Sequence, residues 1–156
     1  LFGICLGLAA KDKPAGFSLL QGKDPKDAAQ TALATAEQLA EAGSWELIGI
    51  GRVYYLSGDK AKGQALFDRV TGRKPQAGDW QRIGEIYAEA GENDKAETCF
   101  QKSLAGNAKD DTGQSEIGAW YVRNGQREKG EALFAKALAR IADLYGDGKP
   151  AARPLI

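Results

Sequence analysis

Near its middle the chain reads Trp80-Gln81-Arg82-Ile83-Gly84-Glu85-Ile86-Tyr87, and it repeats this pattern on either side. The other copies are Leu47-Ile48-Gly49-Ile50-Gly51-Arg52-Val53-Tyr54 and Gln114-Ser115-Glu116-Ile117-Gly118-Ala119-Trp120-Tyr121. Each copy has a Tyr three residues after a Gly, and Gly51, Gly84 and Gly118 are 33 and 34 residues apart. Self-similarity at such a period indicates stacked supersecondary units. The pattern therefore directs attention to the surface that the stack presents.

Each copy is followed by a Gly-containing break and then by a second helical pattern. The expected helices cover about 45–57, 60–72 and 80–90, and the last one runs on to Tyr145. Glycine in each break allows the positive φ that a tight αα-hairpin needs. Asp59 is placed to cap the helix that follows it, and Asp94 with Glu97 offers a capping-box pair.

The second helix of each pair has a small residue with a Phe four positions later. We expect the small residue to let the first helix approach, and the ring to fill the space between the helices. The pairs are Gly63 with Phe67, Ala96 with Phe100, and Gly130 with Phe134.

A further helix is expected before the first copy, at 26–42, where Asp24 suits an N-cap and Pro25 the first turn. The chain then divides into an apolar N-terminal segment with a linker (1–25), a helical domain (26–145) and an irregular tail (146–156). Within the domain the repeats cover about 44–77, 78–110 and 111–145.

The repeated residues resemble those of the tetratricopeptide repeat, a helix–turn–helix unit of about 34 residues. The resemblance covers about 45–142. It departs from the family pattern where Leu47 and Gln114 replace Trp, and the linker proline survives only as Pro75. It implies an all-α fold, an α-α superhelix of stacked antiparallel helix pairs with an extra N-terminal helix.

The resemblance also implies a concave groove, lined by the first helix of each pair, that holds a partner peptide or helix. Its groove positions are Ile48, Arg52, Tyr55, Leu56, Gln81, Glu85, Ala88, Glu89, Ser115, Ala119, Val122 and Arg123. The mixture of apolar and acidic residues suits a ligand with an apolar anchor and a basic group. The carboxylate clamp of repeat co-chaperones is missing, because Ile48, Thr112 and Glu116 stand where it needs basic or amide groups.

A second interface is expected at the C-terminal end, because a stacked array leaves its last unit uncovered. The apolar stripe there continues past the repeat at Leu138, Ile141, Leu144 and Tyr145. Either Leu155-Ile156 folds back over this stripe, or a partner or a second copy of the chain covers it.

Residues 1–10 are uncharged and almost wholly apolar, but fall short of the roughly 20 residues that span a bilayer. A docked helix, the end of a membrane anchor and a signal-peptide remnant all fit. The chain has no Met, so we expect it to be processed or part of something longer. The segment favours an extracytoplasmic place, in a bacterial periplasm or at a membrane, with the cytoplasm as the alternative.

Composition argues against two classes of function. Lys plus Arg and Asp plus Glu both number 21, so the basic excess that nucleic-acid binding needs is absent. The chain has no His, which removes the commonest general base and metal ligand. Its cysteines, Cys5 and Cys99, are too few for a zinc site and are expected to be plain apolar side chains.

The other acidic residues give only weak evidence for a catalytic site. Asp110-Asp111 fits a helix start better than a cation site, and Glu85 with Glu89 fits a solvated groove wall. We therefore expect no enzyme, no cofactor and no metal. The leading interpretation is an interaction module that binds a protein or peptide. The alternative is a structural subunit or assembly factor of a larger, membrane-associated complex, held through its two ends.

Overall fold

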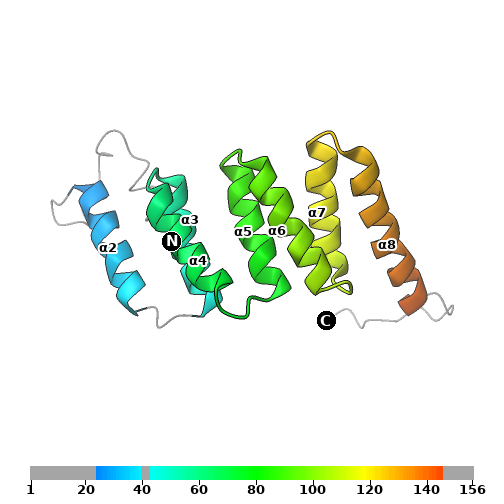
Figure 1. Cartoon of the computed structure of the whole chain (residues 1–156), viewed down its shortest axis with the longest axis horizontal. Helices are drawn as coiled ribbons and strands as arrows, with labels where there is room; N and C mark the ends of the chain where they lie inside the picture. The colour runs from blue at the N-terminus through cyan, green and yellow to red at the C-terminus, as the bar shows by residue number, and fades with distance from the viewer. Residues whose placement is uncertain (1–23, 40–42, 146–156) are drawn as a thin grey trace, which may run out of the picture.

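The computed structural model describes residues 24–39 and 43–145 of the chain. In this part all regular structure is helical, as the sequence predicts. The helices are α2 (Pro25–Leu39), α3 (Ser44–Leu56), α4 (Lys60–Thr71), α5 (Ala77–Glu89), α6 (Asn93–Gly106), α7 (Asp111–Arg123) and α8 (Arg127–Tyr145). They follow one another in a row in chain order, with α2 and α8 at its ends (Figure 1). The most extensive contacts join α3 to α4, α5 to α6, and α7 to α8.

The turn within each pair has the backbone conformation expected from its glycine. Gly58, Gly91 and Gly125 have φ angles of 108°, 78° and 77°, a region that residues with a Cβ rarely adopt. The cap predicted at Asp59 is present, since its carboxylate accepts the N–H of Lys62 at 3.1 Å. These turns fold each pair back on itself and fix which faces of its helices meet.

Two details at helix starts differ from prediction. The predicted capping box of Asp94 and Glu97 is not formed, because α6 begins at Asn93. The Glu97 carboxylate instead lies 2.7 Å from Lys129 Nζ of α8. Helix α5 begins three residues before the expected position. There Asp79 accepts the N–H of Gln76 at 2.8 Å, which satisfies a donor that the first turn leaves free.

The Phe ring lies between the helices of each pair, as expected, and there it packs against a Gly of the first helix. A Cβ built on Gly51 would lie 2.6 Å from Phe67 Cε1, and one on Gly84 would lie 2.7 Å from Phe100 Cε1. On Gly118 the distance to Cε1 of the third ring, that of Phe134, would be 3.0 Å. Only a residue without a Cβ lets the rings come this close, so the repeated glycines set the spacing within each pair.

The first described helix, α2, packs on α3 and contributes the buried side chains Ala29 and Leu33 to the core. The three alternatives for 1–10, the last residues of the helix expected at 26–42 and the tail at 146–156 lie outside the described residues. The division into repeats at 44–77, 78–110 and 111–145 stays a prediction.

Candidate functional site

The helices α3, α5 and α7 form one side of the row, called here the A-helix face. Between α5 and α7 this face contains a pocket of about 430 Å³, the A-face pocket. Four of its lining residues were predicted from the sequence as groove positions, and the structure brings them together. The residues that the site depends on are Glu85, Ala88, Glu116, Ala119, Trp120 and Arg123.

One amide joins two carboxylates in this region. The Nε2 of Gln81 donates to Glu85 Oε1 at 3.0 Å and to Glu116 Oε2 at 2.5 Å. Within the described part of the chain, neither carboxylate has an ion-pair partner. Arg123, which also lines the pocket, has none there either. The A-face pocket therefore carries unneutralised charge of both signs around an apolar floor.

In the neighbouring part of the A-helix face, an ion pair bridges α3 and α5. The Nη2 of Arg52 lies 2.9 and 2.7 Å from the two carboxylate oxygens of Glu89. Two of the predicted groove residues thus bind each other in a bidentate ion pair. A peptide contacting them would first have to compete with that pair.

Sequence reasoning missed a stacked pair on the same side of the row. The guanidinium carbon of Arg82 lies 3.6 Å from the ring centroid of Trp45, whose side chain is 63% exposed. The available signal was helical spacing, because Trp45 precedes Arg52 by seven residues and so shares its face.

Two predicted groove residues belong to the core instead. Ile48 and Tyr55 are 1% and 2% exposed, so the prediction that they line an accessible groove is wrong. Tyr55 is covered because its ring packs against those of Phe67 and Tyr87, at centroid distances of 5.5 Å each.

Three other predicted groove positions differ in how far they are exposed. Leu56 and Val122 are 37% and 38% exposed, and Ser115 is partly buried with its hydroxyl donating to the Asp111 carbonyl at 2.8 Å. Val122 also packs against α8, since a Cβ on Gly130 would meet its side chain. Their role in binding stays a prediction.

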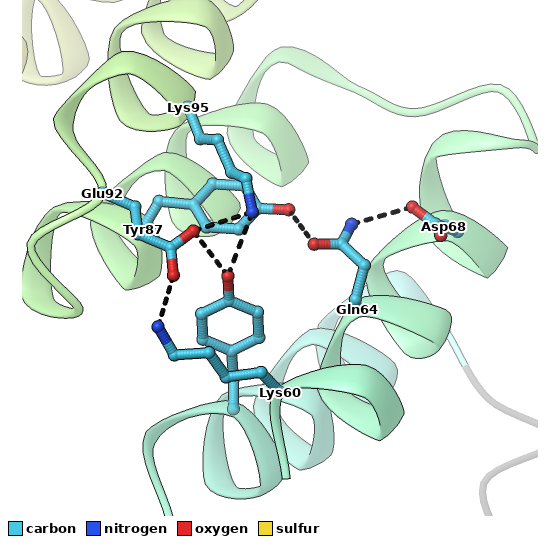
Figure 2. A network of polar contacts seen from close by, with 7 residues as sticks. Lys60, Gln64, Asp68, Tyr87, Glu92 and Lys95 are labelled. Carbon is cyan, nitrogen blue, oxygen red and sulfur yellow. Dashed lines mark hydrogen bonds and ion pairs between the residues drawn. The ribbon is translucent and has the colours of Figure 1, made fainter. Parts of the chain in front are cut away.

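A polar network joins the first two helix pairs, and Figure 2 shows it from close by. Glu92 accepts hydrogen bonds from Lys60 Nζ at 2.5 Å and from the Tyr55 hydroxyl at 2.7 Å, and Lys95 Nζ lies 2.7 Å away. The hydrogen bond from Lys60, followed by those from Lys95 and Tyr55, lowers the pKa of Glu92 to about 2. Burial raises the pKa of Tyr55. At neutral pH the network is thus a charged joint between repeats.

The predicted second interface is exposed where the structure describes it. Leu138, Ile141 and Leu144 of α8 are 65%, 43% and 63% exposed, while the side chain of Tyr145 lies outside the described residues. The ring of Phe134 is only partly buried, in contrast to the corresponding rings in the earlier pairs. In the described part of the chain no further helix follows α8 to cover this face.

Two of the catalytic candidates, Asp110 and Cys99, have structural roles. Asp110 caps α7, since its carboxylate accepts the N–H of Gly113 at 2.9 Å, as expected of a helix start. Cys99 is buried, and this burial raises the pKa of its thiol to about 11. Among the described residues, no three His, Cys, Asp or Glu side chains gather as metal ligands would.

This architecture is that of a tetratricopeptide-repeat solenoid, and two comparisons agree. Residues 80–110 match the family model of the tetratricopeptide repeat. The fold is similar to a solved structure titled "Crystal structure of MamA", with a TM-score of 0.56 and 20% sequence identity. That match covers 76% of this chain and 70% of the other. No curated protein sequence matches the chain significantly.

The repeat and the fold are those of a protein-interaction module in general, and such folds are typically non-catalytic. In the described ranges, none of the helices has the length and apolar character that crossing a membrane requires.

Proposed function

We propose that this protein is a non-catalytic interaction module that binds a segment of a partner protein in the A-face pocket. The observation that carries the proposal is the pocket itself, about 430 Å³ between α5 and α7. Its size suits one or two side chains of a peptide rather than a whole helix. Its apolar floor at Trp120 and Ala119 offers the buried anchor point that interfaces concentrate their binding energy on.

The charges around the pocket define the ligand further. A Lys or Arg of the ligand pairs with Glu85 and Glu116, which Gln81 already holds close together. An adjacent apolar side chain then packs on Trp120, and a carboxylate further along meets Arg123. The three contacts fix the direction of the bound segment as well as its composition.

The non-catalytic part of the proposal is supported by the chemistry of the side chains. The chain has no His to act as a general base. The raised pKa of Cys99 keeps its thiol protonated and therefore a poor nucleophile. Glu85 and Glu116 both accept hydrogen bonds from Gln81, which holds the two carboxylates together as a binding surface for a cation.

Selection from a random-peptide phage library tests this function. We expect the peptides enriched on the wild-type protein to combine a Lys or Arg with a neighbouring large apolar residue. In the double variant Glu85→Lys with Glu116→Lys, their affinity should fall at least about tenfold, as expected when an ion pair becomes a repulsion. The matched control is Asp94→Lys with Glu128→Lys, two exposed acidic residues away from the pocket. Enriched peptides that bind both double variants equally well would refute the proposal.

The alternative function, a structural subunit held through its ends, is favoured by one observation. The apolar side chains Leu138, Ile141 and Leu144 lie exposed along one stripe of α8. Light scattering coupled to size-exclusion chromatography tests self-association through them. A mass above that of the monomer should return to it in Leu138→Glu with Leu144→Glu, but not in Ala132→Glu, which is off the stripe. A strict monomer at micromolar concentration argues against self-association.

A further inference from the structure

The opposite side of the row contains a second pocket, of about 500 Å³, between α4 and α6. We call it the B-face pocket. Both helices pack on α5, but they make no extensive contact with each other, so α5 forms the bottom of the space between them. The buried side chains Phe67, Ile83 and Cys99 line it, and Trp80 is a partly exposed wall. None of the residues of the A-face pocket takes part.

Two of the residues that line this opening differ from those at the equivalent positions of the next junction. One period later, Thr71 corresponds to Leu104 and Cys99 corresponds to Leu133. Leu133 is 8% exposed, and Leu104 packs against the core. At the junction of the second and third pairs these leucines put aliphatic bulk where the B-face pocket has a hydroxyl and a thiol. The first junction therefore has smaller side chains at these two positions than the second junction has.

The first junction also has an aromatic ring and a cation together. Trp80 keeps the Trp of the repeat pattern, whereas Gln114 replaces it one period later. The Nζ of Lys102 lies 4.0 Å from the centroid of the Trp80 ring, and in the described part of the chain Lys102 has no ion-pair partner. A ring face with an ammonium above it attracts an apolar group that carries a carboxylate beside it.

The other polar groups of the pocket limit what it accepts. At the opposite end, Lys95 is already paired with Glu92 (Figure 2). On the α4 side, Asp68 accepts a hydrogen bond from Gln64 Nε2 at 2.9 Å and has no cation partner among the described residues. It remains able to accept a backbone N–H of a bound peptide, since a carboxylate accepts several hydrogen bonds.

We propose that the B-face pocket is a second, independent binding site, for a partner segment in which a large apolar side chain stands next to an Asp or Glu. The side chain packs between Trp80 and Ile83, and the neighbouring carboxylate pairs with Lys102. The charge preference is the opposite of that at Glu85 and Glu116, so the two faces take different segments. One module then bridges two partners, or two parts of one partner.

Titration of the ¹⁵N-labelled protein with the capped tripeptide acetyl-Glu-Phe-Glu-amide tests this site. We expect saturable shifts in the signals of Trp80, Thr98 and Lys102, with a dissociation constant of about 1 mM, as suits so small a ligand. The capped peptides Lys-Phe-Lys and Glu-Gly-Glu should bind at least about tenfold more weakly, because each lacks one of the two required groups.

The filled variant Thr71→Leu with Cys99→Leu uses residues that the chain itself has at the next junction, so it should fold. Its fold is checked by circular dichroism and thermal unfolding. We expect it to lose at least about tenfold in affinity for Glu-Phe-Glu. Lys102→Glu should lose as much, whereas the matched change at the next junction, Lys136→Glu, should leave the affinity within about twofold.

Three results would overturn the proposal: no shifts at millimolar peptide, equal binding of Lys-Phe-Lys, or unchanged affinity in the folded, filled variant. Arg123→Glu, on the A-helix face, should not alter this titration. Failure of the phage selection and failure of this titration are thus separate outcomes.

Discussion

The ring of Phe100 lies directly against the Cα of Gly84, at the centre of the second helix pair. A Cβ built on Gly84 would be 2.7 and 2.8 Å from two ring carbons of Phe100, and 3.1 Å from the Cβ of Cys99. All these atoms are buried. The contact therefore sets the distance between α5 and α6, and it recurs in the other pairs with Phe67 and Phe134.

Replacing Gly84 by Ala should destabilise the protein although Ala is the better helix former. The added methyl group overpacks the contact with Phe100, which costs about 1–3 kcal/mol and exceeds the gain of about 1 kcal/mol in helix propensity. Urea unfolding followed by circular dichroism measures the difference. Gly78→Ala, in the same helix with no atom within 4 Å of its new Cβ, is the control and should be neutral or slightly stabilising. If the two variants proved equally stable, the Gly–Phe contact would not set the packing.

The Phe rings should differ in importance along the row. Phe67→Ala and Phe100→Ala each remove a ring that is 1% or 2% exposed, which should lower the free energy of unfolding by about 3–5 kcal/mol. Phe134→Ala should cost clearly less, because this ring is only partly buried at the open end. Chemical unfolding of the three variants under one set of conditions checks the order. An equal loss at Phe134 would mean that the end of the row is covered in solution.

Residues whose role depends on their own repeat could be predicted from the sequence. The positive φ of Gly91 and the position of the Phe100 ring between the helices of its pair follow from local spacing, and both were expected. The burial of Tyr55 was not, because it depends on a ring from the next pair and on Glu92, 37 residues away. The same holds for the stacking of Arg82 on Trp45. Periodicity shows which positions are equivalent, whereas burial depends on the size and charge of residues in the neighbouring pair.

The charged joint at Glu92 should make stability depend on pH in acid. Its pKa is lowered from 4.5 to about 2, so the stabilisation is complete above the pKa of the unfolded chain and is lost as pH falls from about 4.5 to 2. Glu92→Gln should lower the free energy of unfolding at pH 7 by about 1–2 kcal/mol, a value reduced for partial exposure. The difference from the wild type should shrink as the pH approaches 2.

Urea unfolding of both proteins at several pH values measures this dependence. Glu131→Gln is the matched control, because its ion pair with Arg127 is exposed and joins residues four apart in one helix. Its effect should stay below about 0.5 kcal/mol at every pH. A Glu92→Gln difference that does not change between pH 7 and pH 2 would show that the carboxylate is not stabilised by Lys60 and Lys95.

The thiol of Cys99 should report opening between the first and second helix pairs, since it lines the B-face pocket. It is 5% exposed, and burial raises its pKa to about 11, so almost none of it is thiolate at pH 8. In a Cys5→Ser background, its reaction with Ellman's reagent should be at least about a hundredfold slower than that of the same protein unfolded in urea, because reaction requires local opening. Absorbance of the released thionitrobenzoate gives both rates. Gly84→Ala should speed the reaction, since its new Cβ would lie 3.1 Å from Cys99 Cβ and disturb the packing of α6 on α5 there, whereas Gly78→Ala should not. A thiol that reacts at the unfolded rate in the native protein would show instead that the gap between α4 and α6 admits the reagent freely, which would also make the B-face pocket wider than its lining side chains indicate.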